Sequence, residues 1–242
     1  MAQRPGAARQ PVSSAGAPPS LLVFYGGTFD PVHEGHLAIA RAARDALDCE
    51  IRLMPAADPP HRPPPGADAR QRARMLALAV AGEPGLRVDT RELHRDGPSY
   101  TVDTLRGIRA GIGAAAPLAL LIGGDSLLGL PTWREWEALP GLAHFIVAER
   151  EGSALDAPLP EPLAAALRGR WADDPAQLLQ SPAGRFYRLR QPLHPASATR
   201  VRERIAAGGD WDALVPAAVA AWIRARGLYG AGDDRASNPP PL

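Results

Sequence analysis

Residues 21–37 read LLVFYGGTFDPVHEGHL, and this stretch decides the fold. Its first part, Leu21–Tyr25, is a short apolar and aromatic run, which predicts a buried β-strand. Gly26-Gly27 follows at once, where the chain can turn without a Cβ in the way. Asp30-Pro31 marks a turn, and from about Val32 the residues favour a helix. A strand, a glycine turn and a helix start together bring backbone N–H groups and the positive helix end to one point, which predicts an anion site.

Two histidines, His33 and His36, lie three residues apart at the start of this predicted helix. Residues at that spacing share one helix face, so both rings are expected to point toward the anion site and hold phosphates as charge develops during transfer. A pair of solvated or packed histidines is the alternative, and the position directly after the glycine turn favours the phosphate role. The spacing does not match the zinc-binding HExxH motif, and Cys49 is the only cysteine.

Composition narrows the class of protein further. The chain of 242 residues is long enough for one large or two small domains with a sizeable core. All 27 basic residues are arginine, which excludes a Walker A lysine and a Schiff-base lysine. A formal charge of +1 favours neither nucleic acid nor an anionic membrane as a partner. With one cysteine, no apolar leader and no run long enough to span a bilayer, the protein is expected to be soluble and cytoplasmic.

Strand and helix patterns alternate along the chain, which predicts an α/β fold. We expect a Rossmann-like, doubly wound parallel sheet with C-terminal helices. Residues 1–20 and 231–242 have the composition of a disordered leader and tail, which leaves a single domain over 21–230. The predicted strands cover 21–25, 50–54, 86–88, 118–122, 143–147 and 186–189. The predicted helices cover about 32–47, 69–81, 100–112, 199–207 and 217–226, while 159–184 indicate only a helix and a long loop.

Ligands of such sheets bind beyond the carboxyl ends of the strands, and several polar segments fall at that edge. Residues 59–62, Pro-Pro-His-Arg, form a proline-fixed loop that is either a phosphate contact or simply solvated. Asp125 follows a strand and could accept hydrogen bonds from ribose hydroxyls. Ser197 or Thr199 can cap the helix that carries Arg202, which makes a second anion site.

The segment GGTFDPVHEGHL, residues 26–37, resembles the nucleotide-binding signature of the HxGH nucleotidyltransferases. Further segments resemble, in order, those of the bacterial nicotinate mononucleotide adenylyltransferase family, so the match runs from about Leu21 to Tyr229. These segments are PPHR at 59–62, SYT and TL within 99–105, GDS with two tryptophans at 124–136, SATRVR at 197–202 and the closing residues 219–229. The chain departs from the family pattern at Arg62, where lysine is usual, and at Ala196 and Ala198.

The resemblance implies adenylyl transfer from ATP to nicotinate mononucleotide, which gives nicotinate adenine dinucleotide and pyrophosphate, a step of NAD biosynthesis. It implies Mg²⁺ that bridges phosphate oxygens and needs few protein ligands. Catalytic roles are implied for His33, His36 and Arg202. The implied ATP and phosphate contacts are Gly26, Gly27, Thr28, Phe29, His61, Arg62, Asp125, Ser197 and Thr199. The implied contacts to the pyridine nucleotide are Ser99, Tyr100, Thr101 and Trp133.

Two alternatives to this function differ in class. Another HxGH enzyme, such as phosphopantetheine adenylyltransferase, shares the histidine signature but does not need the SYT and two-tryptophan segments. A nucleotide-sensing protein without catalysis would keep the binding residues alone. The presence of both histidines and of Arg202 argues against the sensor. The sequence does not indicate protein partners.

Overall fold

The centre of the molecule is a seven-stranded sheet in which every neighbouring pair is parallel. The structure is a computed structural model that describes residues 20–57, 65–95, 97–148, 158–191 and 194–232. The strands are β1 (Leu22–Gly27), β2 (Ile51–Pro55), β3 (Leu86–Val88), β4 (Leu118–Gly123), β5 (His144–Ala148), β6 (Trp171–Ala172) and β7 (Phe186–Leu189). Their order across the sheet is β3-β2-β1-β4-β5-β7-β6, as in a Rossmann-like doubly wound fold.

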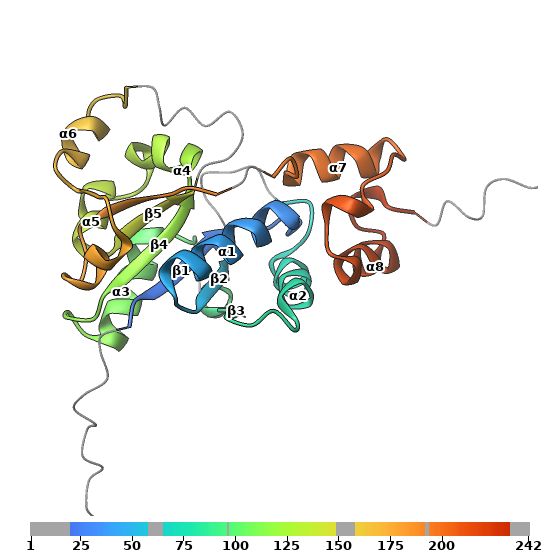
Figure 1. Cartoon of the computed structure of the whole chain (residues 1–242). Coiled ribbons are helices and arrows are strands. Elements are labelled where there is room, and N and C mark those ends of the chain that lie inside the picture. Colours follow the sequence, from blue (N-terminus) through green and yellow to red (C-terminus); the bar gives the residue numbers. More distant parts are fainter. Residues whose placement is uncertain (1–19, 58–64, 96, 149–157, 192–193, 233–242) are drawn as a thin grey trace, which may run out of the picture.

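Helices cover both faces of the sheet (Figure 1). One face carries α1 (Glu34–Leu47) and α2 (Ala69–Val80), and α7 (Ala198–Ala206) and α8 (Ala217–Arg226) lie beyond them on the same side, with α8 packed on α2. The other carries α3 (Thr101–Ile112), α4 (Gly124–Leu128), α5 (Leu139–Leu142) and α6 (Leu163–Leu167). Short 3₁₀ helices are η1 (Arg91–His94), η2 (Leu130–Thr132), η3 (Trp136–Ala138), η5 (Pro175–Leu179), η6 (Asp212–Leu214) and η7 (Leu228–Gly230).

Alternation of side chains along the strands divides the core into two layers. In β1, Val23 and Tyr25 join the layer beneath α1 and α2, whereas Phe24 joins the layer beneath α3. Because both faces are covered, the central strands are apolar at nearly every position, and the five residues of β5 are all buried.

The direction of winding reverses between β1 and β4. β1 pairs with β2 on one side and with β4 on the other, so the loops after β1 and β4 leave the sheet toward opposite faces. A crevice opens at such a switch point, beyond the carboxyl ends of the strands. Gly26 and Gly27, which end β1, and the segment beginning at Gly123 both lie there, so the fold places the predicted anion site at the reversal.

The structure corrects several details of the sequence prediction. A seventh strand, β6, lies within 159–184. The sequence did not predict it, because a strand of two residues has no readable periodicity. Gly26 and Gly27 belong to β1, where they pair with Met54 and Pro55 of β2, so the chain turns after them and not at them. Helix α1 begins at Glu34 rather than near Val32. Helix α3 begins at Thr101, with Tyr100 as its N-cap, rather than at Tyr100. Ala231, assigned above to the tail, is only 8% exposed and packs on the core. His61 and Arg62 lie outside the described residues, as do residues 1–19 of the expected leader and 233–242 of the expected tail.

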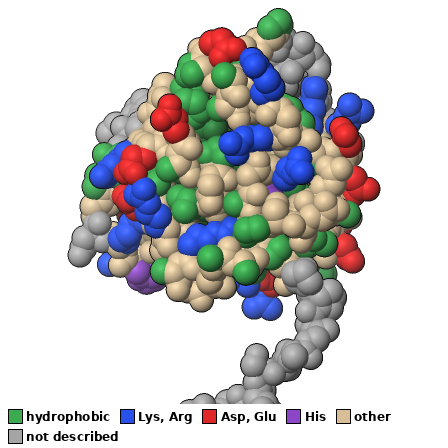
Figure 2. Space-filling view, turned by 90° about the vertical axis from the view of Figure 1, so that its left-hand side faces the viewer, with side chains coloured by type: hydrophobic (Ala, Val, Ile, Leu, Met, Phe, Trp, Pro, Cys, Tyr) green, Lys and Arg blue, Asp and Glu red, His purple; other side chains and the backbone are tan. Residues whose placement is uncertain are grey.

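Charged side chains of both signs are mixed on the surface. Figure 2 shows acidic groups and arginines distributed over one face, with apolar groups between them, in keeping with the formal charge of +1. None of the helices in the described part of the chain is both long enough and apolar enough to cross a membrane.

Candidate active site

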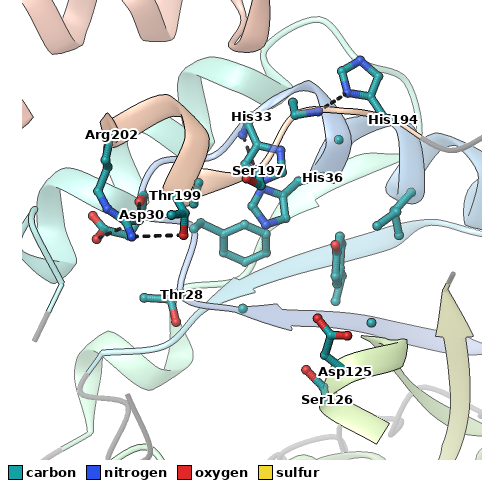
Figure 3. A pocket seen from close by; sticks show the side chains of 18 of the residues that line it. Thr28, Asp30, His33, His36, Asp125, Ser126, His194, Ser197, Thr199 and Arg202 are labelled. Carbon is teal, nitrogen blue, oxygen red and sulfur yellow. Dashed lines mark hydrogen bonds and ion pairs between the residues drawn. The ribbon is translucent and has the colours of Figure 1, made fainter. Parts of the chain in front are cut away.

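Two cavities lie near the end of β1. The larger of them, pocket 1, has a volume of about 830 Å³ and lies beyond the carboxyl end of this strand. The turn after β1 and the first turns of α1 and α7 line it (Figure 3). Both helices therefore direct N-terminal N–H groups and positive dipole ends at one cavity, which suits an extended anion such as a polyphosphate. The predicted site residues that line it are Gly26, Gly27, Thr28, Phe29, His33, His36, Asp125, Ser197, Thr199 and Arg202.

The two histidines stack on each other, with ring centroids 3.7 Å apart and an angle of 29° between the planes. His33 is the N-cap of α1 and is not on the helix, so cap geometry, rather than a shared helix face, brings the rings together. Nδ1 of His36 accepts a hydrogen bond from the backbone N–H of His33 at 3.3 Å. In the neutral ring the proton must then be on Nε2, which leaves that nitrogen as a donor.

Two neighbours fix the position of this pair. The ring of Phe29 meets His36 edge-on, with centroids 4.9 Å apart, and Phe29 has the left-handed φ of 52°. Such a backbone conformation is unfavourable for a bulky residue and persists where the surroundings enforce it. Gly35 lies against the segment that enters α7: a Cβ at this position would be 2.8 Å from the carbonyl oxygen of Ala196. Only glycine therefore allows that segment to close over the first turn of α1.

Asp30 ties the turn after β1 to distant parts of the chain. Its side chain accepts from the backbone N–H groups of Gly66 at 2.8 Å and Ala67 at 3.1 Å. Its carbonyl oxygen accepts from Nη1 of Arg202 at 2.6 Å, while Nη2 of Arg202 donates to the Thr199 hydroxyl at 3.4 Å. Arg202 is thus held at the edge of pocket 1 with 36% of its side chain exposed, and its guanidinium is already bound in part to the protein.

The cap of α7 forms as the sequence predicts. Ser197 is the N-cap residue, and its hydroxyl accepts from the backbone N–H of Arg200 at 3.2 Å. Thr199 lies in the first turn of α7 and lines pocket 1 together with Ser197 (Figure 3). His194, which the sequence did not single out, also lines the cavity, and its Nδ1 accepts from the N–H of Ala196 at 3.2 Å.

A smaller cavity, pocket 2, has a volume of about 280 Å³ and lies on the α3 side of β1. The four residues predicted to contact the pyridine nucleotide, Ser99, Tyr100, Thr101 and Trp133, all line it. Its apolar lining is completed by Met54, Leu105, Leu120 and Ile122. The aromatic and aliphatic surface, with the N-terminal turn of α3 at its edge, suits a flat ring that carries a polar or anionic substituent.

Charged residues that the sequence did not single out also line pocket 2. Glu92 is buried, and its Oε1 accepts from the hydroxyl of Thr104 at 2.6 Å. Thr104 in turn accepts from Nη1 of Arg95 at 3.0 Å. The guanidinium of Arg134 lies over the ring of Tyr100, 4.8 Å from its centroid. Trp136, by contrast, packs on the apolar core and does not line this cavity.

The two pockets share the end of β1 and the start of α4. Gly26, Gly27 and Thr28 line both cavities, as do Asp125 and Ser126. Figure 3 shows Asp125 and Ser126 across the turn from the histidines. Two ligands bound in these cavities would therefore meet at the turn after β1. Within the described residues, no group of three or more His, Cys, Asp or Glu side chains could hold a metal ion.

Comparisons with known proteins agree with this geometry. Residues 24–204 match the family model described as cytidylyltransferase-like. The chain is 60% identical to the probable nicotinate-nucleotide adenylyltransferase of Stenotrophomonas maltophilia (strain K279a) over 215 residues, which are 87% of this chain and 97% of the relative. It is 49% identical to the protein with the same description from Xylella fastidiosa (strain M12), over 89% of this chain and 99% of the relative.

Solved structures give the same fold. The Plasmodium falciparum nicotinic acid mononucleotide adenylyltransferase complexed with NaAD superimposes with a TM-score of 0.68. It is 16% identical, and the match covers 88% of this chain and 98% of that one. At this identity the likeness concerns the fold.

Proposed function

The chain belongs to the cytidylyltransferase-like family, among its nicotinate-nucleotide adenylyltransferases, and we propose that it transfers the adenylyl group of ATP to nicotinate mononucleotide. The products are nicotinate adenine dinucleotide and pyrophosphate, so the reaction is a step of NAD biosynthesis. The observation that carries this proposal is the junction of an anion-binding pocket with an aromatic pocket at Gly26–Thr28.

The chemistry needs few groups from the protein. The 5′-phosphate of the mononucleotide is the nucleophile, and its second pKa of about 6 leaves it largely ionised at neutral pH. It attacks the α-phosphorus of ATP, and pyrophosphate leaves, so no proton must be removed by a general base. Catalysis then consists of alignment of the two substrates and stabilisation of charge on the transferred group.

Each predicted residue has a role consistent with its position. Gly27, at the end of β1, and Thr28 line both pockets at their junction, where the α-phosphate would be. His36, with Nδ1 occupied by a backbone N–H, presents its Nε2–H as a donor to phosphate oxygens, and His33 stacks beside it. Arg202, in the second turn of α7, lines pocket 1 and would contact the departing pyrophosphate.

The roles in pocket 2 follow from its lining. Trp133 and Tyr100 offer faces on which a pyridine ring can stack, and the N–H groups of the first turn of α3 can donate to its carboxylate. Asp125 lines both pockets and can accept from a ribose hydroxyl. His61 and Arg62 keep their proposed phosphate contacts on the sequence resemblance alone.

Mg²⁺ fits this site as a companion of the triphosphate. Mg²⁺ commonly binds through one or two carboxylates together with substrate phosphates and water, and Asp125 is a carboxylate that lines both pockets. When bound, the ion would neutralise part of the phosphate charge. We also propose a cytoplasmic location, because the substrates are cytoplasmic metabolites and the single cysteine suits a reducing compartment.

Pyrophosphate release tests the function directly. The purified chain is given ATP with Mg²⁺ and, in separate reactions, nicotinate mononucleotide, 4′-phosphopantetheine or no acceptor. We expect release with the first acceptor and a dinucleotide product identified by mass. Release only in the reaction with 4′-phosphopantetheine would indicate the other HxGH activity. ATP binding without release in any reaction would indicate a nucleotide sensor, and either result would overturn the proposal.

A further inference from the structure

Arg72 on α2 is a buried cation that binds only backbone oxygens among the described residues. Arg72 is only 1% exposed. Nε donates to the carbonyl of Ala67 at 3.1 Å, and Nη2 donates to that of Ala57 at 2.9 Å. Nη1 donates to the carbonyls of Thr28 and Ala56, each at 2.7 Å. Four of the five guanidinium N–H groups are therefore used on four peptide carbonyls.

Two of these four carbonyls belong to residues that line the pockets. Thr28 lines both cavities and Ala56 lines pocket 2. The N–H of Ala56 donates to the carbonyl of Gly27 at 2.9 Å. The N–H of Ala57 donates to the hydroxyl of Ser99 at 3.1 Å. The segment Ala56–Ala57 thus bridges from the end of β1 to the start of α3, and Arg72 binds the carbonyls of the same two residues.

We propose that Arg72 is a positioning residue that fixes the distance and orientation of the two pockets relative to each other. One rigid, planar group binds Thr28, at the junction where the phosphates would meet, and the bridge that leads to Ser99. The inference rests on the proposed function, because the alignment matters only if two substrates react across the junction. A shift of about 1 Å at a reacting centre costs roughly 100-fold in rate.

The chemistry of the side chain explains why arginine is needed. A lysine ammonium has three donors on one atom and cannot reach four carbonyls spread around a planar fork. The charge also lies near the phosphate turn, and the carboxylate of Asp30 is its largest favourable charge interaction. A residue that served stability alone would lower the melting temperature when changed but would leave the rate per folded molecule intact.

The test compares Arg72→Lys with Arg70→Lys, a matched change at an exposed position of the same helix. For Arg72→Lys we expect kcat to fall roughly 10- to 100-fold. Because each cavity keeps its own lining, the Kd of ATP alone and of nicotinate mononucleotide alone should stay within about three-fold of wild type. Arg70→Lys should match wild type in all three quantities. If Arg72→Lys does not fold, Arg72→Gln, which keeps a planar pair of donors, takes its place.

Hydrogen exchange provides a readout that does not depend on activity. The amides of Ala56 and Ala57 should exchange faster in Arg72→Lys than in wild type, with no change in Arg70→Lys. A kcat within about two-fold of wild type, a loss accounted for by weaker binding of one substrate, or unchanged exchange at both amides would overturn the inference. If the wild type turns over neither acceptor, the proposed function fails, while the exchange result still decides the role of Arg72.

Discussion

The hydroxyl of Tyr229 donates a hydrogen bond to Oδ1 of Asp30 at 2.7 Å, across 199 residues of sequence. This contact joins the end of the folded chain to the turn that lines pocket 1. Burial raises the pKa of the Tyr229 phenol above its ordinary value, and the hydrogen bond to Asp30 adds to that effect. The phenol therefore remains a donor throughout the pH range in which the protein would work.

Tyr229→Phe should lower the free energy of unfolding, because the buried carboxylate of Asp30 loses the hydrogen bond that the Tyr229 hydroxyl donates to it. A hydrogen bond to a charged group is worth about 1.5–3 kcal/mol, which corresponds to a fall of about 3–12 °C in the melting temperature for a domain of this size. Thermal unfolding measures the change. Tyr187→Phe is the control, since no described residue binds the Tyr187 hydroxyl. Equal melting temperatures for all three proteins would contradict the prediction.

His36→Ala should reduce turnover far more than it weakens substrate binding. The imidazole is held by stacking and by the N–H of His33, so it is a preorganised donor. Loss of such a donor typically costs roughly 10²–10³ in rate. Steady-state kinetics with both substrates measure the effect, and His94→Ala, at an exposed position outside both pockets, should be neutral. Near-wild-type turnover in folded His36→Ala would refute the assignment.

The enzyme should prefer nicotinate mononucleotide to its nicotinamide counterpart. The N–H groups at the start of α3 can donate to both oxygens of a carboxylate, whereas an amide turns an NH₂ group toward one of them. Hydrogen bonds to a charged group are worth about 1.5–3 kcal/mol, so the ratio of kcat/KM should be at least roughly 10- to 100-fold. Rates with both acceptors at saturating ATP decide it. A ratio near one would show that pocket 2 is indifferent to the ring substituent.

Stability should fall in mild acid through His144. This residue is fully buried at the start of β5; Nε2 donates to the carbonyl of Ser181 at 2.8 Å, and Nδ1 accepts from the N–H of Arg185 at 3.0 Å. Burial, the largest cause, lowers the pKa of His144 below its ordinary 6.5. Below that pH the unfolded chain therefore binds a proton that the folded protein excludes, and stability declines as the pH falls toward the folded pKa.

Melting temperatures at about pH 7.5 and about pH 5.5 test this assignment. The fall between the two conditions should be smaller in His144→Gln than in wild type, because glutamine does not titrate. An equal fall in both proteins would place the acid sensitivity elsewhere.

Removal of residues 1–19 and 233–242 should leave activity and melting temperature nearly unchanged, because these segments lack apolar periodicity and carry no motif. The matched deletion begins at Leu228 and also removes Tyr229 and the buried Ala231. It should lower both quantities. A large loss on removal of the outer segments alone would show that one of them binds the folded domain.

Much of the fold could be predicted from the sequence because its signals are local. The apolar runs of β1 and β4 are each contained within a few residues, and alternation with helical periodicity then implies a parallel sheet. The strand order, with its reversal between β1 and β4, follows the rules of that class. Most of the residues that line the two pockets were predicted because short motifs of the sequence resemble those of a known family.

The remainder depends on contacts between distant residues, which no local pattern reveals. Gly35 is required by a carbonyl more than a hundred residues later, at Ala196. Asp30 has the sequence context of an ordinary turn, yet it binds Arg202 and Tyr229. Arg72, a charged residue within a helix, would be expected at the surface, but it is buried and donates hydrogen bonds to peptide carbonyls. Strand β6 forms because β7 offers an edge, and its two residues have no periodicity of their own.

The close approach of Gly35 to Ala196 also determines when, during synthesis of the chain, the nucleotide site can be completed. During synthesis the histidine pair and the glycine turn leave the ribosome early, but the segment that closes over them leaves near the end. ATP is then a ligand of the finished fold and, by mass action, stabilises the complete chain. A fragment that ends before residue 196 lacks the segment that closes over the first turn of α1 and the α7 residues that line pocket 1, so we expect ATP to stabilise it less than the complete chain.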